Sequence, residues 1–311
     1  MSEFHHVSVL LDECIEALNI KPDGIYVDGT LGGAGHSYHI AEKLTTGRLI
    51  GIDRDPVALA AAGKRLEPFG DRVTLVHSNF CRMAQVLEEL EIPGVDGILL
   101  DLGVSSPQLD DGARGFSYMA DAPLDMRMDA GDALTAHTVV NTWSQEELKR
   151  ILYDYGEERY APAIAAAIVR RRETAPIETT LELVDVIRSA MPAAALREKQ
   201  HPAKRSFQAI RIAVNDELNS VSQAMETMIP KLNPGGRLAV ITFHSLEDRI
   251  VKSAMAAGAK GCICPPEFPV CVCGRKPQVK LLTRKPIVSG DEELDRNPRA
   301  RSAKLRVCEK L

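Results

Sequence analysis

The segment IYVDGTLGGAGHS, residues 25–37, decides the fold because a buried strand gives way there to a loop with almost no side chains. Its first three residues, Ile-Tyr-Val, are typical of a β-strand, and Asp28 follows at the strand's end. Four glycines then fall within seven residues, although a glycine within regular structure costs about 0.5–1 kcal/mol relative to alanine. The segment therefore predicts a strand-to-helix turn at which a ligand approaches main-chain N–H groups.

Apolar runs of the same kind recur along the chain and indicate a parallel sheet. Helical stretches, such as 56–66 and 82–90, lie between the first four runs. Continuous apolar strands that alternate with helices are typical of a sheet covered on both faces. The sequence therefore predicts the α/β class with a doubly wound sheet. The predicted strands are 24–28, 48–53, 72–78, 95–101 and 236–243.

A long insertion separates the fourth and fifth predicted strands. The fourth strand ends at residue 101 and the fifth begins at 236, whereas a simple strand–helix–strand unit needs only about 30 residues. The inserted segment has helical signals, including a capping box at Ser144 and Glu147 and apolar residues spaced by three and four over 207–228. We therefore predict a split core, 1–108 and 215–311, around an inserted all-helical domain, 109–214.

The composition is that of a globular protein, with 45% hydrophobic and 26% charged residues among 311. The first 20 residues lack a basic n-region and carry acids within their apolar stretch, so neither a signal peptide nor a membrane span is predicted. Seven cysteines, an odd number, do not suit a secreted disulfide scaffold. We expect a cytoplasmic protein.

Basic residues gather at the C-terminal end. Residues 274–311 contain 11 Lys and Arg against 5 Asp and Glu, in a chain of net charge −5. A basic tail on an acidic body suits a polyanionic partner bound by one face, although such tails are as often solubilising surface. The candidate phosphate contacts are Arg170, Arg171, Arg172, Lys204, Arg205, Arg211, Arg275, Lys276, Arg284, Lys285, Arg296, Arg299, Arg301, Lys304 and Arg306.

A second acidic strand end favours a site for S-adenosylmethionine (SAM). A dinucleotide site needs G-x-G-x-x-G, whereas this loop has G-x-x-G-G-x-G and its acidic residue precedes it. Asp53 ends the second strand, where a carboxylate accepts both ribose hydroxyls at about 1.5–3 kcal/mol for each bond. Asn79 and Phe80 end the third strand, where an adenine could be hydrogen-bonded and stacked. The alternatives are a tight turn, a helix-capping Asp53 and a core Phe80.

The fourth strand ends at Asp101, at the sheet edge where ligands bind in open α/β folds. The loop SSPQ, residues 105–108, partly matches the [DNS]-P-P-[YFW] loop of amino-methyltransferases, in which two acceptors hold the N–H bonds of an amine. Pro-Cys and Thr-Cys, which would supply a nucleophile for carbon methylation, are absent from the sequence. This absence favours N-methylation over carbon methylation, and an ordinary proline turn stays the alternative for Ser105 and Ser106. The catalytic candidates are Asp101, Ser105, Ser106 and Pro107.

Motifs along the whole chain resemble the RsmH family, also called MraW. They include DGTLGGAGHS, ILLDLGVSSPQLDD, HPAKRSFQAIRIAVNDEL and VITFHSLEDRIVK. The resemblance implies a Rossmann-like SAM-methyltransferase sheet and methylation of N4 of a cytidine in the decoding region of 16S ribosomal RNA. The substrate is expected to be rRNA in a partly assembled small ribosomal subunit, recognised by the helical insert. The implied SAM contacts are Ala34, Gly35, His36, Asp53, Phe80, Asp101 and Gln108.

Two details of the site stay open at this stage. Many members of the resembled family have glycine where Ala34 stands, and we expect little cost from alanine if its φ is negative. His244, at the end of the fifth strand, is either a substrate contact or a structural histidine.

The segment CICPPEFPVCVC, residues 262–273, holds four cysteines whose role is open. Four thiolates could bind zinc tetrahedrally, but C-x-C is tighter than the usual C-x₂-C. A reduced loop or a redox-labile pair is the alternative, and the predicted site includes no metal. The cysteines are Cys262, Cys264, Cys271 and Cys273.

Rival functions are a ribosome-assembly or RNA-binding protein that holds SAM without turnover and an NAD-dependent oxidoreductase. The glycine spacing disfavours the oxidoreductase. A small-molecule methyltransferase is a third alternative, which the large insert with its basic flanks disfavours. The sequence does not distinguish a monomer from a homodimer.

Overall fold

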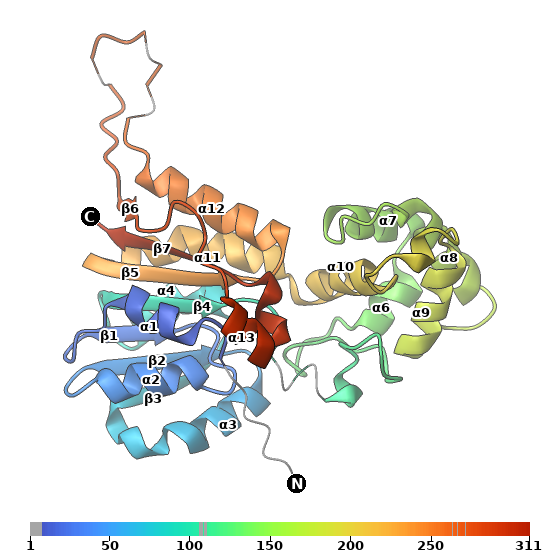
Figure 1. Cartoon of the computed structure of the whole chain (residues 1–311), viewed down its shortest axis with the longest axis horizontal. Coiled ribbons are helices and arrows are strands. Elements are labelled where there is room, and N and C mark those ends of the chain that lie inside the picture. The colour runs from blue at the N-terminus through green and yellow to red at the C-terminus, as the bar shows by residue number, and fades with distance from the viewer. Residues whose placement is uncertain (1–7, 106–107, 109–110, 263, 266, 271) are drawn as a thin grey trace. The chain divides into compact units, whose positions relative to one another are not determined.

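A computed structural model of the chain describes residues 8–105, 108, 111–262, 264–265, 267–270 and 272–311 (Figure 1). The chain forms two compact units, Met1–Gly103 with Leu218–Leu311 and Val104–Glu217. The second unit thus begins five residues earlier and ends three residues later than the predicted insert, 109–214.

The first unit is built on a seven-stranded sheet with the order β3-β2-β1-β4-β5-β7-β6. The strands β3, β2, β1, β4 and β5 are parallel, as predicted, and β7 pairs antiparallel with both β5 and β6. The strands are β1 (Ile25–Asp28), β2 (Arg48–Asp53), β3 (Val73–His77), β4 (Val95–Asp101), β5 (Leu232–Thr242), β6 (Val279–Leu281) and β7 (Lys304–Lys310).

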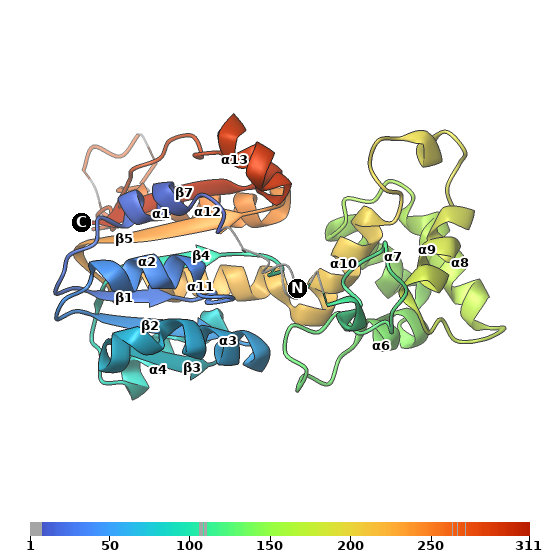
Figure 2. The same cartoon turned by 60° about the horizontal axis from the view of Figure 1, so that its bottom comes forward.

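Helices cover both faces of this sheet (Figure 2). Successive residues of β4 point to opposite faces: Ile98 and Leu100 pack with α4, α11 and α12, whereas Leu99 packs with α1 and α2. All three side chains are fully buried, which explains the continuous apolar runs in the sequence. The doubly wound α/β fold is therefore confirmed. The helices are α1 (Leu11–Leu18), α2 (Gly35–Lys43), α3 (Pro56–Leu66), α4 (Met83–Glu89), α11 (Glu217–Lys231), α12 (Ser245–Ala259) and α13 (Asp291–Arg296).

The basic C-terminal segment holds two strands that the sequence analysis did not predict. In β7, the apolar residues Leu305 and Val307 are buried and alternate with charged residues. Arg306 is also buried, and its guanidinium makes two hydrogen bonds of 2.6 and 3.0 Å to the Asp248 carboxylate. The alternation of apolar and charged residues with period two indicated a strand. It was overlooked because the segment was interpreted only by its excess of basic residues.

Within its described residues, the second unit has helices and no strand of the sheet, and its buried side chains form a core of its own. The Ser144 capping box is present: Ser144 Oγ accepts from Glu147 N (3.3 Å), and Ser144 N donates to Glu147 Oε2 (2.8 Å). Within the described residues of both units, every helix is too short or too polar to serve as a membrane span. The helices of the second unit include α6 (Ala136–Thr142), α7 (Gln145–Asp154), α8 (Ala161–Arg172), α9 (Thr180–Ser189) and α10 (Lys204–Asn215).

The apolar spacing over 207–228 predicts one long helix, and this prediction is wrong because two helices occupy the stretch. α10 and α11 are separated at Asp216, whose φ of +49° lies in the left-handed region. Aspartate adopts this conformation more readily than most residues. The preceding residue, Asn215, is buried in the second unit, where its side chain makes two hydrogen bonds of 2.8 Å to main-chain groups. The apolar spacing continues across the break and therefore hid it.

Candidate cofactor site

The strand order reverses between β1 and β4, and ligands of doubly wound sheets bind outside the carboxyl ends of the strands at this point. Three carboxylates mark that edge, since β1 ends at Asp28, β2 at Asp53 and β4 at Asp101. The glycine-rich loop that leaves β1 runs along the same edge into α2. The structure therefore places the predicted loop and the predicted acids in one region.

Asp28 fixes the loop from beneath. Its carboxylate is buried and accepts hydrogen bonds from Thr30 N (3.1 Å) and from the Ser37 hydroxyl (2.8 Å). Burial raises the pKa of Asp28 to about 6, although the two hydrogen bonds oppose this shift. Asp28 thus joins the start of the loop to the first turn of α2. It supports the site and is not itself exposed to a ligand.

Asp53 holds the middle of the loop. Its Oδ2 accepts from Gly32 N (2.7 Å), and its Oδ1 accepts from Asp55 N (2.8 Å). Burial raises the pKa of Asp53, and these main-chain hydrogen bonds oppose the shift. The main-chain N–H of Arg54 also interacts with this carboxylate. Two carboxylate oxygens have four lone pairs in all, so these three donors leave acceptor capacity for the ribose hydroxyls predicted from the sequence. The helix cap of α3 is Asp55, which accepts from Val57 N, so the capping alternative for Asp53 is wrong.

The loop conformation corrects the expectation for Ala34. Its φ is +57° and it is fully buried as the N-cap of α2, so the negative φ on which the low cost of alanine depended is not present. A left-handed conformation costs a residue with a Cβ roughly 1–2 kcal/mol. At the next position, a Cβ on Gly35 would overlap Ser8 Oγ, so a larger residue there would require the Ser8 side chain to move. At Gly33 an added Cβ would meet no atom within 4 Å, so this part of the loop borders open space.

His36 links the loop helix to the end of β4. Its buried Nε2 lies 2.9 Å from Val9 O, and because a carbonyl only accepts, Nε2 carries the proton. Nδ1 lies 3.9 Å from Asp101 Oδ2. His36 is therefore fixed at the predicted site, with one ring nitrogen directed toward Asp101.

Asp101 has the most unusual environment at this edge. Its main-chain N–H donates to Thr30 Oγ1 (2.6 Å), whereas its buried Oδ1 has no hydrogen-bond partner among the described residues. Burial, together with the negative charges of Asp28 and Glu247, raises the pKa of Asp101 to about 8. The carboxyl group therefore carries a proton most of the time at neutral pH. An unpartnered buried oxygen beside a glycine-rich loop fits a ligand with a positively charged group, such as SAM.

The two adenine contacts predicted at the end of β3 have different environments. Asn79 caps a short 3₁₀ helix, η2 (Phe80–Arg82): its Oδ1 accepts from Cys81 N (3.1 Å), and its Nδ2 donates to Ser220 Oγ (3.3 Å). Its amide thus has a structural role. Phe80 is half-buried and lies next to the loop, since a Cβ on Gly29 would be 3.1 Å from the Cβ of Phe80. Its side chain also packs against the core of the first unit, so its stacking on adenine stays a prediction.

The predicted acceptor loop belongs to the second unit, and Ser106 and Pro107 lie outside the described residues. Ser105 and Gln108 bond reciprocally: Ser105 N donates to Gln108 Oε1 (3.1 Å), and Gln108 N donates to Ser105 Oγ (3.4 Å). Gln108 is buried. Since the units are separate, the roles of these four residues toward SAM and substrate stay predictions.

His244 has a structural role that the sequence left open. It is the N-cap of α12, and its Nδ1 accepts from Glu247 N (3.4 Å). The buried Glu247 Oε2 accepts in turn from Phe243 N (2.9 Å) and His244 N (3.3 Å). The spacing H-x-x-E is that of a capping box with histidine in place of serine, and this was the available signal.

Several of the arginines that were predicted to contact phosphate instead bind to groups within their own unit. Arg211 makes a bidentate ion pair with Glu217 (both 2.8 Å), as Arg306 does with Asp248. Arg172 donates to two main-chain carbonyl groups within the second unit. A hollow of about 450 Å³ beside α8 and α9 is lined by both arginines and acids, which does not favour a phosphate. The exposed basic residues that remain include Arg170, Lys204, Lys276, Arg284, Lys285 and Arg301.

A doubly wound sheet with a glycine loop and carboxylates at its switch point defines an α/β protein that binds a nucleoside cofactor. Comparison with known proteins narrows this class. Residues 3–311 match the model of the MraW methylase family. The chain is 59% identical to the ribosomal RNA small subunit methyltransferase H of Heliobacterium modesticaldum over 310 residues, 99% of both chains. It is 59% identical to the protein of the same name from Brevibacillus brevis over 309 residues, 99% of this chain and 98% of the relative.

The chain therefore belongs to the MraW methylase family, and its cofactor is SAM. Among solved structures, a putative rRNA-methylase from Clostridium thermocellum aligns over 98% of this chain and 100% of its own, with a TM-score of 0.46 at 12% identity. The family assignment rests on the sequence matches alone.

Proposed function

We propose that the protein transfers a methyl group from SAM to the N4 amine of a cytidine in the decoding region of 16S ribosomal RNA. The proposed substrate is the rRNA in a partly assembled small subunit in the cytoplasm. The observation that carries this proposal is the SAM-type edge at Asp53 and Asp101, in a chain whose relatives are named for small-subunit rRNA. The amine target is supported by the partial match of residues 105–108 to an amino-methyltransferase loop.

SAM supplies a methyl group on a positively charged sulfur. Around it, we assign Asp53 to the ribose hydroxyls, Phe80 to the adenine and Asp101 to a positive charge of the cofactor. The Asp101 carboxyl group loses its proton more easily when a cation lies beside its free Oδ1.

The acceptor amine needs its own support, because its lone pair is delocalised into the cytosine ring. Two acceptors that hold the N–H bonds favour a tetrahedral nitrogen and stabilise the charge that develops on it. Only three residues separate Asp101 from Ser105 in the chain, so the acceptor loop follows directly from the strand end that carries Asp101. We therefore assign this task to a side-chain oxygen of Ser105 or Ser106 and to a main-chain carbonyl fixed by Pro107.

The proposal is tested on rRNA from cells with and without the gene. Mass spectrometry of small-subunit rRNA is expected to show one cytidine that loses an N4-methyl group in the deletion strain. Complementation with the wild-type gene restores it, and complementation with Asp101→Ala does not. An unchanged modification pattern would contradict the proposed reaction.

A second experiment separates the enzyme from the ribosome-assembly alternative. Purified protein with radiolabelled SAM is offered free 16S rRNA, small subunits stripped of late proteins, and free cytidine. We expect label in the subunit-bound rRNA and none in cytidine, because an isolated nucleoside offers little binding surface. SAM binding without label transfer to any of these substrates would favour the assembly role.

A further inference from the structure

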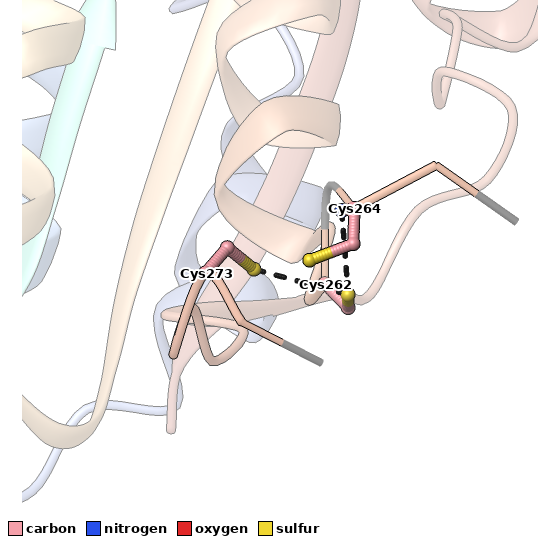
Figure 3. A group of neighbouring side chains, drawn as sticks. All are labelled: Cys262, Cys264 and Cys273. Carbon is pink, nitrogen blue, oxygen red and sulfur yellow. Dashed lines mark hydrogen bonds between the residues drawn. The ribbon is translucent and has the colours of Figure 1, made fainter. Parts of the chain in front are cut away.

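Three cysteine sulfurs meet in the segment between α12 and β6, far from the cofactor site in sequence (Figure 3). The Sγ atoms of Cys262, Cys264 and Cys273 all lie within 4.8 Å of one another, and none of the three is in a disulfide. Cys271, the fourth cysteine of this motif, lies outside the described residues. Nothing in the proposed methyl transfer uses these side chains.

The spacing of the sulfurs fits a tetrahedral metal ion. With Zn–S bonds of about 2.3 Å, two sulfurs of a tetrahedron are about 3.8 Å apart. The Sγ atoms of Cys262 and Cys273 are 3.8 Å apart. A disulfide would instead need about 2.05 Å between them. The sulfurs are thus separated as metal ligands are, at a distance that also fits the hydrogen bond from the Cys273 thiol to Cys262 Sγ.

Main-chain N–H groups of the segment also donate hydrogen bonds to two of these sulfurs. Cys264 N donates to Cys262 Sγ (3.4 Å), and Val272 N donates to Cys264 Sγ (3.3 Å). These hydrogen bonds orient the sulfurs in the manner of the outer hydrogen bonds around a metal centre. Two of the three sulfurs are therefore positioned by main-chain donors.

The segment between α12 and β6 has no hydrophobic core of its own that could order it. The described residues of the segment 260–278 protrude from the first unit (Figure 1) and contain no helix or strand. Their base is tied down, since Arg275 donates to Ala257 O (2.9 Å) and Gln278 N to Gly258 O (2.8 Å). Farther out, the apolar side chains are solvent-exposed: Phe268 is 50% and Val270 is 70% exposed. Loops of this length without secondary structure are uncommon unless something orders them.

We propose that Cys262, Cys264 and Cys273 bind one Zn²⁺ ion, which closes the loop 260–278 as a structural knuckle. Three thiolates supply three corners of the tetrahedron, and the fourth goes to a ligand beyond this described trio. Soft thiolate ligands select zinc over magnesium or calcium, and a surface loop whose order depends on the ion is the usual structural use of zinc. The proposal is independent of the methyl-transfer reaction.

Metal content of the full-length protein is the direct test. Protein is expressed with zinc in the medium, purified under reducing conditions without chelator, and analysed by inductively coupled plasma mass spectrometry. We expect about one zinc per chain for the wild type. The variants Cys262→Ser, Cys264→Ser and Cys273→Ser should each lose most of it. Cys81→Ser, which removes a thiol elsewhere in the same unit, is the matched control and should keep it.

Three further measurements accompany the metal analysis. Thermal melts followed by circular dichroism should be nearly the same for the wild type and the three loop variants, because the loop cysteines lie outside the cores of the first unit. Cobalt substitution of the wild type should give the charge-transfer and d–d absorption of tetrahedral thiolate-bound Co²⁺. A zinc-specific chelator should speed trypsin cleavage after Arg275 in the wild type and in Cys81→Ser, but not in the three loop variants.

Three results would overturn the proposal. Wild-type protein that contains no zinc and binds none when it is added would do so. Zinc that persists in all three serine variants would place the metal elsewhere. Mass spectrometry that finds a disulfide among these cysteines in freshly purified, unreduced protein, with no metal, would assign them to redox chemistry instead.

Discussion

The ionisation of Asp101 should make cofactor affinity depend on pH. Its pKa of about 8 means that roughly one tenth of the protein has Asp101 ionised at pH 7, and roughly one thirtieth at pH 6.5. The positively charged cofactor prefers the ionised form, so the apparent affinity is reduced by that fraction. The Kd for SAM should therefore fall about 25-fold between pH 6.5 and pH 8.5 through this group alone.

The variant Asp101→Asn supplies the reference for this measurement. It keeps the shape of the side chain but cannot ionise, so its Kd lacks the Asp101 contribution at every pH. The amine of SAM titrates in the same range, and Asp28 and His36 lie nearby, but these groups are present in both proteins and largely cancel in the ratio of Kd values. Isothermal titration calorimetry at half-unit steps of pH gives that ratio. A ratio that is constant from pH 6.5 to 8.5 would refute the role assigned to Asp101.

Three further outcomes are expected. Asp53→Ala should weaken SAM binding by about 100-fold or more, because two charge-assisted hydrogen bonds of about 1.5–3 kcal/mol each are lost; calorimetry that finds an unchanged Kd would remove Asp53 from the site. Thr30→Val should lower the free energy of unfolding by about 1–3 kcal/mol, since Asp101 N would lose its acceptor; urea denaturation measures this, and a neutral result would mean that another acceptor replaces Oγ1. Paired Arg284→Ala and Lys285→Ala should weaken rRNA binding and reduce its salt dependence; filter binding at several salt concentrations checks this, with an equal salt slope as the contrary result.

The stability of the cofactor-free protein should also depend on pH through Asp101. The native state holds the Asp101 proton up to about pH 8, whereas the unfolded chain releases it near its ordinary value of 3.8. The native state therefore binds more protons between these values, and this group lowers stability as the pH rises through that window. Without cofactor, Asp101→Asn should gain melting temperature relative to the wild type as the pH is raised from 5 to 8. Parallel melting curves across that range would contradict the raised pKa.

The parallel part of the fold was predictable because its signals are local. The strand that ends at Asp28, the glycine loop and the strand that ends at Asp53 each lie within a few residues, and buried parallel strands have the same apolar runs in every such sheet. The Ser144 capping box was recognised for the same reason.

The features that the sequence analysis missed depend on distant partners. Thr30 matters only because Asp101 N lies against its hydroxyl, 71 positions away in the chain. Arg306 was predicted to contact phosphate because its ion-pair partner, Asp248, lies 58 positions away in the chain. The positive φ of Ala34 follows from how the loop is closed between Asp28 and α2, and residue type does not reveal it. Long-range contacts therefore set the details of the site.

The position of β7 also has a consequence for synthesis of the chain. The strand pairs with β5 through residues 237–242 and with β6 through 279–281, so it lies inside the sheet and not at an edge. A nascent chain emerges at about 5–20 residues per second, and the flank of β5 stays unpaired until residues near 310 leave the ribosome exit tunnel. During that interval the growing polypeptide has an open strand edge that other chains could pair with. Loss of these last residues would make that exposure permanent.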